Sequence, residues 1–334
     1  MTAPRFGFFF WPYEPALVER MVRLGEQGGW DLVGIADTPG NAMDVWVALA
    51  QAATLSTRVR LASCVTNLAT RDPAITAGAA ASLDRLSSGR FALGVGAGHS
   101  GVVNVGRRPS PPSELREGLA RIRTLLDGDG AAPGRHVPVY AAASGPGALR
   151  TAGAAADGAF VNHGLGADET ARARALLAEG AAQAGRAIAA FDTWFIACLD
   201  VSERRETALG QLGNILGFVA AYVLGPAPAE RGVPAELVPA VAELRRQYTT
   251  RRREMDPDLV RRLGLFDYLR RRLAVAGTPD DCVEQARAAL EAGATNLMFT
   301  VSLAADPIRT VELFGRHVLP ALSATAVDSG RPQE

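Results

Sequence analysis

Small, polar and glycine residues follow the ends of several predicted strands, and no cluster of carboxylates accompanies them. Where strands run parallel, their carboxyl ends meet on one side, so we expect these residues to lie together. Such a set suits a flat cofactor resting on main chain better than a hydrolytic cleft, which needs paired carboxylates. The residues concerned are Tyr13, Glu14, Asp37, Thr38, Cys64, Val65, Thr66, Asn67, Ala97, Gly98, His99, Ser100, Ala143, Ser144, Gly145, Gly147, Asn162 and His163.

Two glycine-rich segments point to a ligand more directly. In GVGAGHSG, Gly96 and Gly98 would let main chain approach the plane of a ligand. In AAASGPGALR, Gly145 and Gly147 open a helix after a strand, where free N–H groups and the helix dipole favour an anion. The Ser144 hydroxyl could add a hydrogen bond there. Each segment could instead be an ordinary turn between a strand and a helix.

His99 and His163 are the histidines within this set, and either could donate or accept a proton near neutral pH. Either could instead be a hydrogen-bonded structural residue. Asp37 is open to two interpretations as well, because its carboxylate could bind a ring nitrogen or cap the following helix. The residue types alone do not separate these alternatives.

Composition excludes several classes of protein. Lysine and arginine number 35, as do aspartate and glutamate, so the formal charge is zero and we expect no nucleic-acid or membrane partner. The sequence contains no lysine, which excludes a pyridoxal-phosphate Schiff base and a Walker-type phosphate loop. The four histidines form no metal-binding pair and the three cysteines no disulfide framework. We therefore expect no metal and a reducing, cytoplasmic location.

Strands and helices alternate along the chain, and they must position these residues. The predicted strands cover 5–11, 31–36, 59–65, 90–95, 136–142, 158–162, 191–200 and 295–301. The predicted helices between them cover 15–28, 43–55, 72–86, 112–126, 148–156 and 168–184, with a closing helix over 307–322. Eight strand–helix units favour a single-domain (β/α)8 TIM barrel over 1–334, rather than an open doubly wound sheet.

A helical insertion between the seventh and eighth strands, residues 201–277, interrupts this alternation. Helices are predicted within it over 212–223, 237–253 and 259–273. The insertion is a solvated addition, a cap over the barrel mouth or a dimer surface. An uncharged run over 207–229 is long enough to suggest a membrane helix, but polar residues and two prolines interrupt it. A buried helix is the better explanation.

Three stretches carry motifs of a known family. The most specific is TNLATRDPAITAGAAASLDRLSSGRFALGVGAGHSG (66–101), and the others are PVYAAASGPGALRTAGAAADGAF (138–160) and VAGTPDD (275–281). On these motifs the chain resembles the bacterial luciferase-like flavin/deazaflavin oxidoreductases. Within that family it is most similar to the coenzyme F420-dependent methylenetetrahydromethanopterin reductase-like proteins. The resemblance covers nearly the whole chain.

This resemblance implies an eight-stranded barrel that binds coenzyme F420, a deazaflavin that carries a hydride at ring carbon 5. It also implies a non-prolyl cis peptide at Cys64–Val65, in a bulge that supports the back face of the ring. The ring would lie over residues 64–66 and 97–98, and the phosphate tail at 144–147. A homodimer is expected from the same resemblance.

Two positions depart from the family's pattern. The second strand of family members often ends in Asp-His, whereas this chain has Asp37-Thr38, so Thr38 stands where a histidine proton donor is expected. Family members often carry a carboxylate after the third glycine of the strand-four loop, whereas this chain has His99. The family's pterin substrate is therefore not carried over. His99 and Glu14 are the candidates for proton transfer.

The expected function is an F420-dependent reductase or dehydrogenase. It would transfer a hydride between the deazaflavin and a C=C, C=N or C=O bond of a small molecule, such as a biosynthetic intermediate. One alternative is an FMN-dependent luciferase-like monooxygenase. A second alternative is a cofactor-free barrel that serves as a binding or regulatory subunit. The identity of the bound cofactor separates all three.

Overall fold

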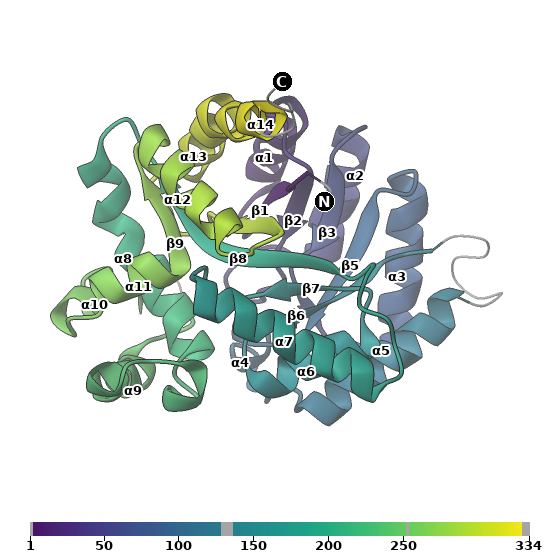
Figure 1. The fold of residues 1–334 in the computed structure, drawn as a ribbon. Coiled ribbons are helices and arrows are strands. Elements are labelled where there is room, and N and C mark those ends of the chain that lie inside the picture. The colour runs from purple at the N-terminus through teal and green to yellow at the C-terminus, as the bar shows by residue number, and fades with distance from the viewer. Residues whose placement is uncertain (1–2, 128–135, 252–253, 329–334) are drawn as a thin grey trace, which may run out of the picture.

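Eight parallel strands close into a barrel in the computed structural model, which describes residues 3–127, 136–251 and 254–328 (Figure 1). In order around the barrel they are β1 (Phe6–Phe10), β2 (Leu32–Ile35), β3 (Arg60–Ser63), β5 (Phe91–Gly96), β6 (Val139–Ala143), β7 (Gly158–Val161), β8 (Asp192–Val201) and β10 (Asn296–Thr300). Strand β10 pairs with both β1 and β8, which closes the ring. The predicted parallel barrel is therefore confirmed, and the open sheet is excluded. The single domain over 1–334 stays a prediction, and both ends of that range lie outside the described residues.

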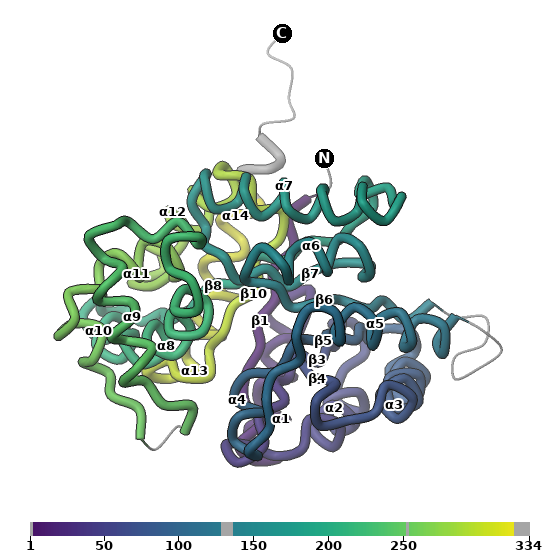
Figure 2. The backbone as a smooth tube through the Cα atoms, turned by 90° about the horizontal axis from the view of Figure 1, so that it is seen from below, coloured from purple at the N-terminus to yellow at the C-terminus, as the bar shows by residue number. Residues whose placement is uncertain are grey.

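Helices cover the outside of the barrel (Figures 1 and 2). They are α1 (Pro15–Gln27), α2 (Val45–Leu55), α3 (Pro73–Leu86), α5 (Pro112–Asp127), α6 (Pro146–Ala155), α7 (Ala167–Gln183), α12 (Pro279–Glu291), α13 (Pro307–Leu313) and α14 (Leu319–Asp328). Helix α3 begins as the sequence predicts, because the Asp72 side chain accepts from the Ala74 N–H and Pro73 holds the first helical position. The predicted closing helix over 307–322 is instead two helices joined by a π-helical turn, Phe314–Val318.

The interior of the barrel is packed with side chains. Trp194, Phe160 and Tyr140 are the largest members of a buried cluster that is separate from the layer between strands and helices. Cys64 and Ile196 belong to the same cluster, and both also line a cavity at the carboxyl ends of the strands. The barrel is therefore closed below this cavity, as a small parallel barrel should be.

The third predicted strand, 59–65, is shorter than expected. Strand β3 ends at Ser63, the Cys64–Val65 peptide is cis, and a two-residue strand β4 (Thr66–Asn67) then pairs with β5. The cis peptide lies where the family resemblance implies it. Gly94 on β5 makes room for this step, since a Cβ there would lie 2.1 Å from the Ser63 carbonyl oxygen. The sequence analysis also missed the short helix α4 (Ser100–Val103), which follows β5.

The chain between β8 and β10 is mostly helical and gathers beside the barrel (Figures 1 and 2). Before α12 it forms α8 (Arg205–Val223), α9 (Val238–Gln247), α10 (Leu259–Arg262), α11 (Phe266–Leu273) and β9 (Ala274–Gly277). Residues 252–253 of the predicted helix 237–253 lie outside the described residues, and α9 ends at Gln247. The predicted helix 259–273 is broken at Gly264, whose φ of +67° is left-handed. We refer to residues 205–273 as the helical segment.

Strand β9 corrects the purely helical prediction for 201–277. Strand β8 pairs with β10 over Trp194–Cys198 and with β9 over Cys198–Val201. The helical segment has its own hydrophobic cluster, which reaches the barrel through Cys198 and the residues of β9. The segment is therefore attached to the barrel both by packing and by a strand.

No helix in the described part of the chain is long and apolar enough to cross a membrane. The cysteines Cys64, Cys198 and Cys282 are buried and free. Burial raises the pKa of each of these thiols, because a thiolate loses its hydration in the interior. They are therefore unreactive packing groups in this structure.

Candidate active site

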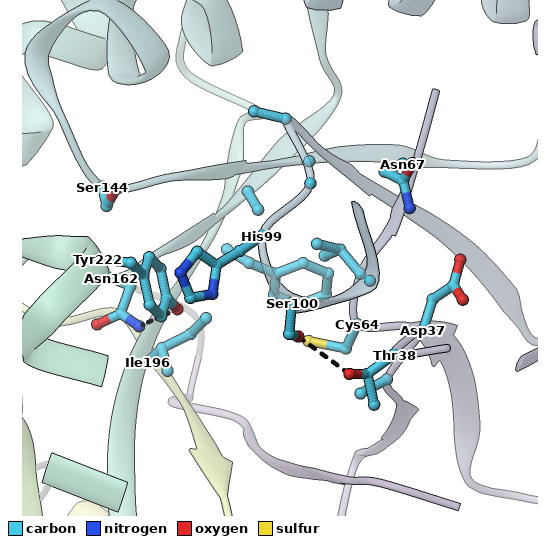
Figure 3. Close-up of a pocket in the computed structure, with 18 of the residues that line it drawn as sticks. Asp37, Thr38, Cys64, Asn67, His99, Ser100, Ser144, Asn162, Ile196 and Tyr222 are labelled. Atoms are coloured by element: carbon cyan, nitrogen blue, oxygen red, sulfur yellow. Dashed lines mark hydrogen bonds between the residues drawn. The ribbon is translucent and has the colours of Figure 1, made fainter. Parts of the chain in front are cut away.

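A cavity of about 230 Å³ lies at the carboxyl ends of the barrel strands (Figure 3). One side, which we call the floor, is made of main chain and small side chains from the ends of β3, β5 and β6. Its residues are Cys64, Val65, Gly96, Ala97, Gly98, Ala142 and Ala143. The opposite side, which we call the aromatic wall, consists of Trp11, His99, Phe218 and Tyr222. The cavity thus has one flat side and one side built from rings.

The floor is flat because larger side chains would collide there. A Cβ at Gly96 would lie 2.9 Å from Val65 Cγ2 and 3.3 Å from Ala142 Cβ. The Ala142 methyl group is the β6 side chain that is open to the cavity, since Ala141 and Ala143 pack in the core between strands and helices. Close approach of three strand ends therefore dictates small residues here.

Gly98 fixes the turn from the floor into α4. Its φ of +88° is left-handed, and a Cβ there would lie 2.1 Å from Val102 Cγ2. Gly101 is equally constrained, because its Cβ would lie 2.5 Å from the Asp37 carbonyl oxygen. A larger residue at Gly98 would displace α4 and His99 as well as block a ligand. Substitution at Gly98 therefore cannot separate folding from binding.

The polar side chains at the end of β2 are held by neighbouring hydroxyls. Thr66 Oγ1 donates to Asp37 Oδ2 at 2.7 Å, and Thr38 Oγ1 donates to Ser100 Oγ at 3.0 Å. Burial raises the pKa of Asp37, and the Thr66 hydrogen bond opposes this effect. Among the described residues, Asp37 is the one carboxylate that lines the cavity. The described chain contains no group of His, Cys, Asp and Glu side chains that could hold a metal ion.

His99 lies where the floor meets the aromatic wall. Its ring centroid is 4.4 Å from that of Tyr222, and it stacks on Tyr248 at 5.8 Å with an interplanar angle of 8°. His99 Nε2 is 2.5 Å from the Tyr248 hydroxyl oxygen. Burial, and then the charge of Arg245, lower the pKa of His99 to about 4. The imidazole is therefore neutral at neutral pH.

Helix α8 supplies two of the four rings of the aromatic wall. Phe218 and Tyr222 are four residues apart and so share one face of the helix. Trp11 packs edge-on against Phe218 at 5.4 Å. The Tyr222 hydroxyl accepts from Asn162 Nδ2 at 3.1 Å, whereas Asn162 Oδ1 is buried without a partner among the described residues (Figure 3). The unpartnered Asn162 Oδ1 is therefore an acceptor at the edge of the wall.

Arg231 covers the turn between β6 and α6. Its Nη1 donates to Ser144 Oγ at 3.4 Å, and a Cβ at Gly145 would lie 2.5 Å from its Nη2. The buried Arg272 donates to the carbonyl oxygens of Arg231 and His163, and His163 Nδ1 is 2.9 Å from the Ser144 carbonyl oxygen. Burial lowers the pKa of His163, and the nearby arginines lower it further. A fixed guanidinium therefore stands at the amino end of α6.

Comparison with known proteins identifies the family. The profile of the luciferase-like monooxygenases matches residues 12–296. The chain belongs to this family. It is 28% identical to a 5,10-methylenetetrahydromethanopterin reductase of Archaeoglobus fulgidus, over 95% of this chain and 99% of that protein. It is 29% identical to an F420-dependent glucose-6-phosphate dehydrogenase of Rhodococcus erythropolis, over 92% of this chain and 94% of that protein.

Solved structures of luciferase-like proteins share the barrel. The coenzyme F420-dependent tetrahydromethanopterin reductase of Methanopyrus kandleri has a TM-score of 0.76 at 23% identity, covering 96% of this chain and 100% of that one. A type II Baeyer–Villiger monooxygenase component of Pseudomonas putida, solved with FMN, has a TM-score of 0.66 at 18% identity, covering 96% and 99%. At these identities the likeness concerns the fold.

Most of the site residues predicted for this luciferase-like chain line the cavity. These are Asp37, Thr38, Cys64, Val65, Asn67, Ala97, Gly98, His99, Ala143, Ser144 and Asn162. Thr66, Gly145 and His163 are buried just behind it, in contact with Asp37, Arg231 and Ser144 respectively. Gly147 is exposed in the first turn of α6 and Glu14 is exposed before α1, and neither lines the cavity. The catalytic and binding roles stay predictions.

Four residues of the helical segment that lie at or near the cavity were not predicted from the sequence. Phe218 and Tyr222 had a signal, because they are aromatic residues at helical spacing in an otherwise aliphatic stretch. Arg231 is the last residue of a short 3-10 turn, and Tyr248 follows the end of α9. Long-range contacts place these two side chains, and no local pattern reveals such contacts. Luciferase-like motifs in the sequence identify the floor and His99, and not the other residues of the wall.

Proposed function

We propose that this chain is a coenzyme F420-dependent oxidoreductase. It would transfer a hydride between carbon 5 of the deazaflavin and a C=C, C=N or C=O bond of a small-molecule substrate. The observation that carries this proposal is the flat floor, which offers main chain and methyl groups to a planar ring and ends at the Ser144–Arg231 pair. Relatives named as F420-dependent include a reductase and a dehydrogenase with unlike substrates, which favours a shared cofactor.

The residues of the cavity fit a deazaflavin ring. Asn162 Oδ1 and His99 Nδ1 are buried without partners among the described residues, so each can bond a ligand. Asn162 Oδ1 would accept from an N–H or hydroxyl group of the ring. The floor would hold the ring flat, and the aromatic wall would exclude water from its other face. The bound cofactor supplies or accepts the hydride, and the chain supplies binding and orientation.

The turn between β6 and α6 fits the phosphate-bearing arm of the cofactor. Free N–H groups at the amino end of α6 favour negative charge, and the Ser144 hydroxyl lies beside them. Arg231 adds a fixed positive charge at the same place, because its guanidinium rests on Gly145. Charge-assisted hydrogen bonds of this kind are about twice as strong as neutral ones. The arm would therefore extend from the ring at the floor toward Arg231.

The cofactor is tested by fluorescence titration of the full chain with coenzyme F420 and with FMN. We expect saturable binding of F420, and at least about tenfold weaker binding of FMN. Binding of FMN without F420 would assign the chain to the FMN-dependent monooxygenases. Binding of neither would favour a cofactor-free binding or regulatory barrel. Identification of any cofactor that copurifies provides an independent check.

The arm site is tested by Arg231→Gln. We expect this variant to bind F420 about 10- to 50-fold more weakly, because a charge-assisted contact to phosphate is lost. It should bind the deazaflavin riboside, which lacks the phosphate arm, as tightly as the wild type does. Arg316→Gln is the matched control, since Arg316 is exposed and pairs with Glu312 on the far helices. Equal losses for F420 and the riboside would place the arm elsewhere.

A further inference from the structure

His99 combines one fixed nitrogen with one free nitrogen. Its Nε2 is bonded to Tyr248, whereas Nδ1 is buried and has no hydrogen-bond partner among the described residues. His99 lines the cavity, and Figure 3 shows its ring beside Tyr222 and Asn162. A buried polar atom without a partner is unfavourable, because it has lost its hydration. The site is therefore arranged so that a ligand can complete the hydrogen bonding of Nδ1.

The tautomer of His99 follows from the group that holds Nε2. The ring is neutral at neutral pH, so one nitrogen carries a proton and the other accepts one. A phenol O–H is a stronger donor than a neutral imidazole N–H. Tyr248 therefore donates to Nε2, which leaves the ring proton on Nδ1. Three other polar groups lie near the His99 imidazole. Tyr222 faces it, the charge of Arg245 acts on it, and Asp37 lines the same cavity.

Tyr248 is held in place by the barrel rim. Two residues further on, Thr250 Oγ1 donates to Asn104 Oδ1 at 2.6 Å, and the Thr250 carbonyl oxygen accepts from Asn41 Nδ2 at 2.8 Å. Asn104 and Asn41 lie in the connections that follow β5 and β2. The stacked rings of Tyr248 and His99 add a third constraint. The Tyr248 hydroxyl is thus positioned from outside the helical segment as well as from within it.

We propose that His99 Nδ1–H protonates the substrate, and that Tyr248 is the positioning residue that keeps the proton on Nδ1. The inference rests on the proposed function, because a reduced deazaflavin must supply the hydride. It also narrows the substrate class to carbonyl compounds and imines. Their oxygen or nitrogen can accept a hydrogen bond from Nδ1–H, whereas an isolated C=C bond has no such atom.

The proton moves in step with the hydride. As the hydride reaches the carbonyl carbon, the C–O π bond breaks and its electron pair takes the proton from His99 Nδ1. Nε2 takes the proton of Tyr248, so the imidazole stays neutral with its tautomer reversed. After the product leaves, Nε2 returns this proton to the half-buried Tyr248 and Nδ1 takes a proton from water, which restores the starting tautomer. The substrate gains a hydride and a proton and becomes an alcohol, or an amine from an imine. Reduced deazaflavin would supply the hydride, and the proton that it loses on oxidation would pass to water.

The tautomer is measured by 15N NMR of the full chain labelled in its four histidines, with His99→Gln identifying the His99 signals. We expect a protonated Nδ1 and a hydrogen-bonded, unprotonated Nε2 at neutral pH. Tyr248→Phe keeps the stacked ring and removes the hydroxyl. We expect it to mix the two tautomers and to raise the pKa of His99, because neutral imidazole loses a donor. A proton on Nε2 in the wild type overturns the proposal.

Tyr140→Phe is the matched control. It removes another buried hydroxyl, which donates to Asp192 inside the barrel, and it should leave the His99 tautomer unchanged. With F420 bound, benzaldehyde, cyclohexanone and 1-pyrroline serve as carbonyl and imine probes, and cyclohexene as the negative probe. We expect the Nδ1–H resonance to move downfield when at least one of the carbonyl or imine probes is added. It should not move when cyclohexene is added. No response to any carbonyl or imine overturns the substrate class.

The outcomes separate this inference from the proposed function. If the wild type binds no F420, the proposed function fails whatever the tautomer. If F420 binds and the proton lies on Nε2, this inference fails alone. Where a probe is reduced, Tyr248→Phe should slow single-turnover hydride transfer about 10- to 100-fold, with F420 affinity changed less than about twofold. An unchanged rate would remove Tyr248 from the reaction.

Discussion

The floor and the aromatic wall of the cavity are built in different ways. The floor consists of main chain and methyl groups at the ends of β3, β5 and β6, so strand pairing fixes its shape. Two of the four rings of the wall, Phe218 and Tyr222, come from the helical segment and pack against that segment's own hydrophobic cluster. A change at these two rings therefore leaves the barrel intact, whereas a larger residue at Gly96 or Gly98 would collide with its neighbours. We infer that the floor specifies the cofactor and the wall the substrate.

The largest expected effect is a block of the floor. Ala142→Leu places an isobutyl group in the cavity between β5 and β6, where a planar ring would lie. We expect F420 affinity to fall more than about 100-fold, measured by fluorescence titration. Ala120→Leu on the exposed face of α5 is the matched control and should bind normally. Normal binding by a folded Ala142→Leu chain would show that the ring lies elsewhere.

A smaller effect is expected from opening the wall. Phe218→Ala removes a ring that faces the cavity without touching the floor, so F420 affinity should change less than about fivefold. Iodide should quench the bound deazaflavin about twice as strongly, because water reaches its outer face. Phe266→Ala is the control, since this half-buried ring of α11 does not line the cavity. Equal quenching in both variants would mean that the wall does not cover the ring.

The smallest effect concerns the junction between the barrel and the helical segment. Asp200 lies where β8 pairs with β9, and it accepts from the Ala305 N–H at 2.8 Å. Burial raises its pKa to about 7, so the folded chain keeps a proton that the unfolded chain releases near pH 4. This group's contribution to stability therefore falls by roughly 1 kcal/mol per unit as pH rises from about 4 to 7, and then levels off.

Asp200→Asn tests this sign by thermal unfolding. The midpoint of the wild type should drop by a few degrees more than that of the variant between about pH 5 and pH 8. Asp267→Asn is the control, because Asp267 is exposed in the first turn of α11 and is not among the groups that shift Asp200. A parallel pH dependence of wild type and Asp200→Asn would show that Asp200 is ionised throughout.

The floor could be predicted from the sequence because local rules place it. Glycine is required at 96 because neighbouring strand ends approach closely, and at 98 because the turn is left-handed. Both glycines belong to a glycine-rich segment that can be recognised in the sequence. The strand–helix alternation puts the strand ends on one side, which gathered Asp37, Cys64 and Asn162 correctly into one cavity. Here secondary-structure periodicity and backbone sterics are sufficient.

The contacts that the helical segment makes with the site could not be predicted in the same way. Tyr248 reaches His99 across 149 positions of the sequence, and Arg231 reaches Ser144 across 87. Such contacts depend on how the helical segment packs against the barrel. Neither the hydrophobic periodicity of the sequence nor its turn residues indicate that packing. Position after a strand also selected Glu14, but that residue turns outward before α1. A position after a strand therefore predicts that a residue lies near the strand ends. It does not predict where the side chain points.

The forked pairing of β8 limits how this enzyme can be rebuilt. Because the end of β8 pairs with β9, removal of residues 205–277 would leave that end without its partner at the rim. An exchange of the helical segment between relatives should therefore join the chains before Ala274, so that β8 and β9 of one protein stay paired. Chimeras that lose β9 are expected to aggregate through the bare edge.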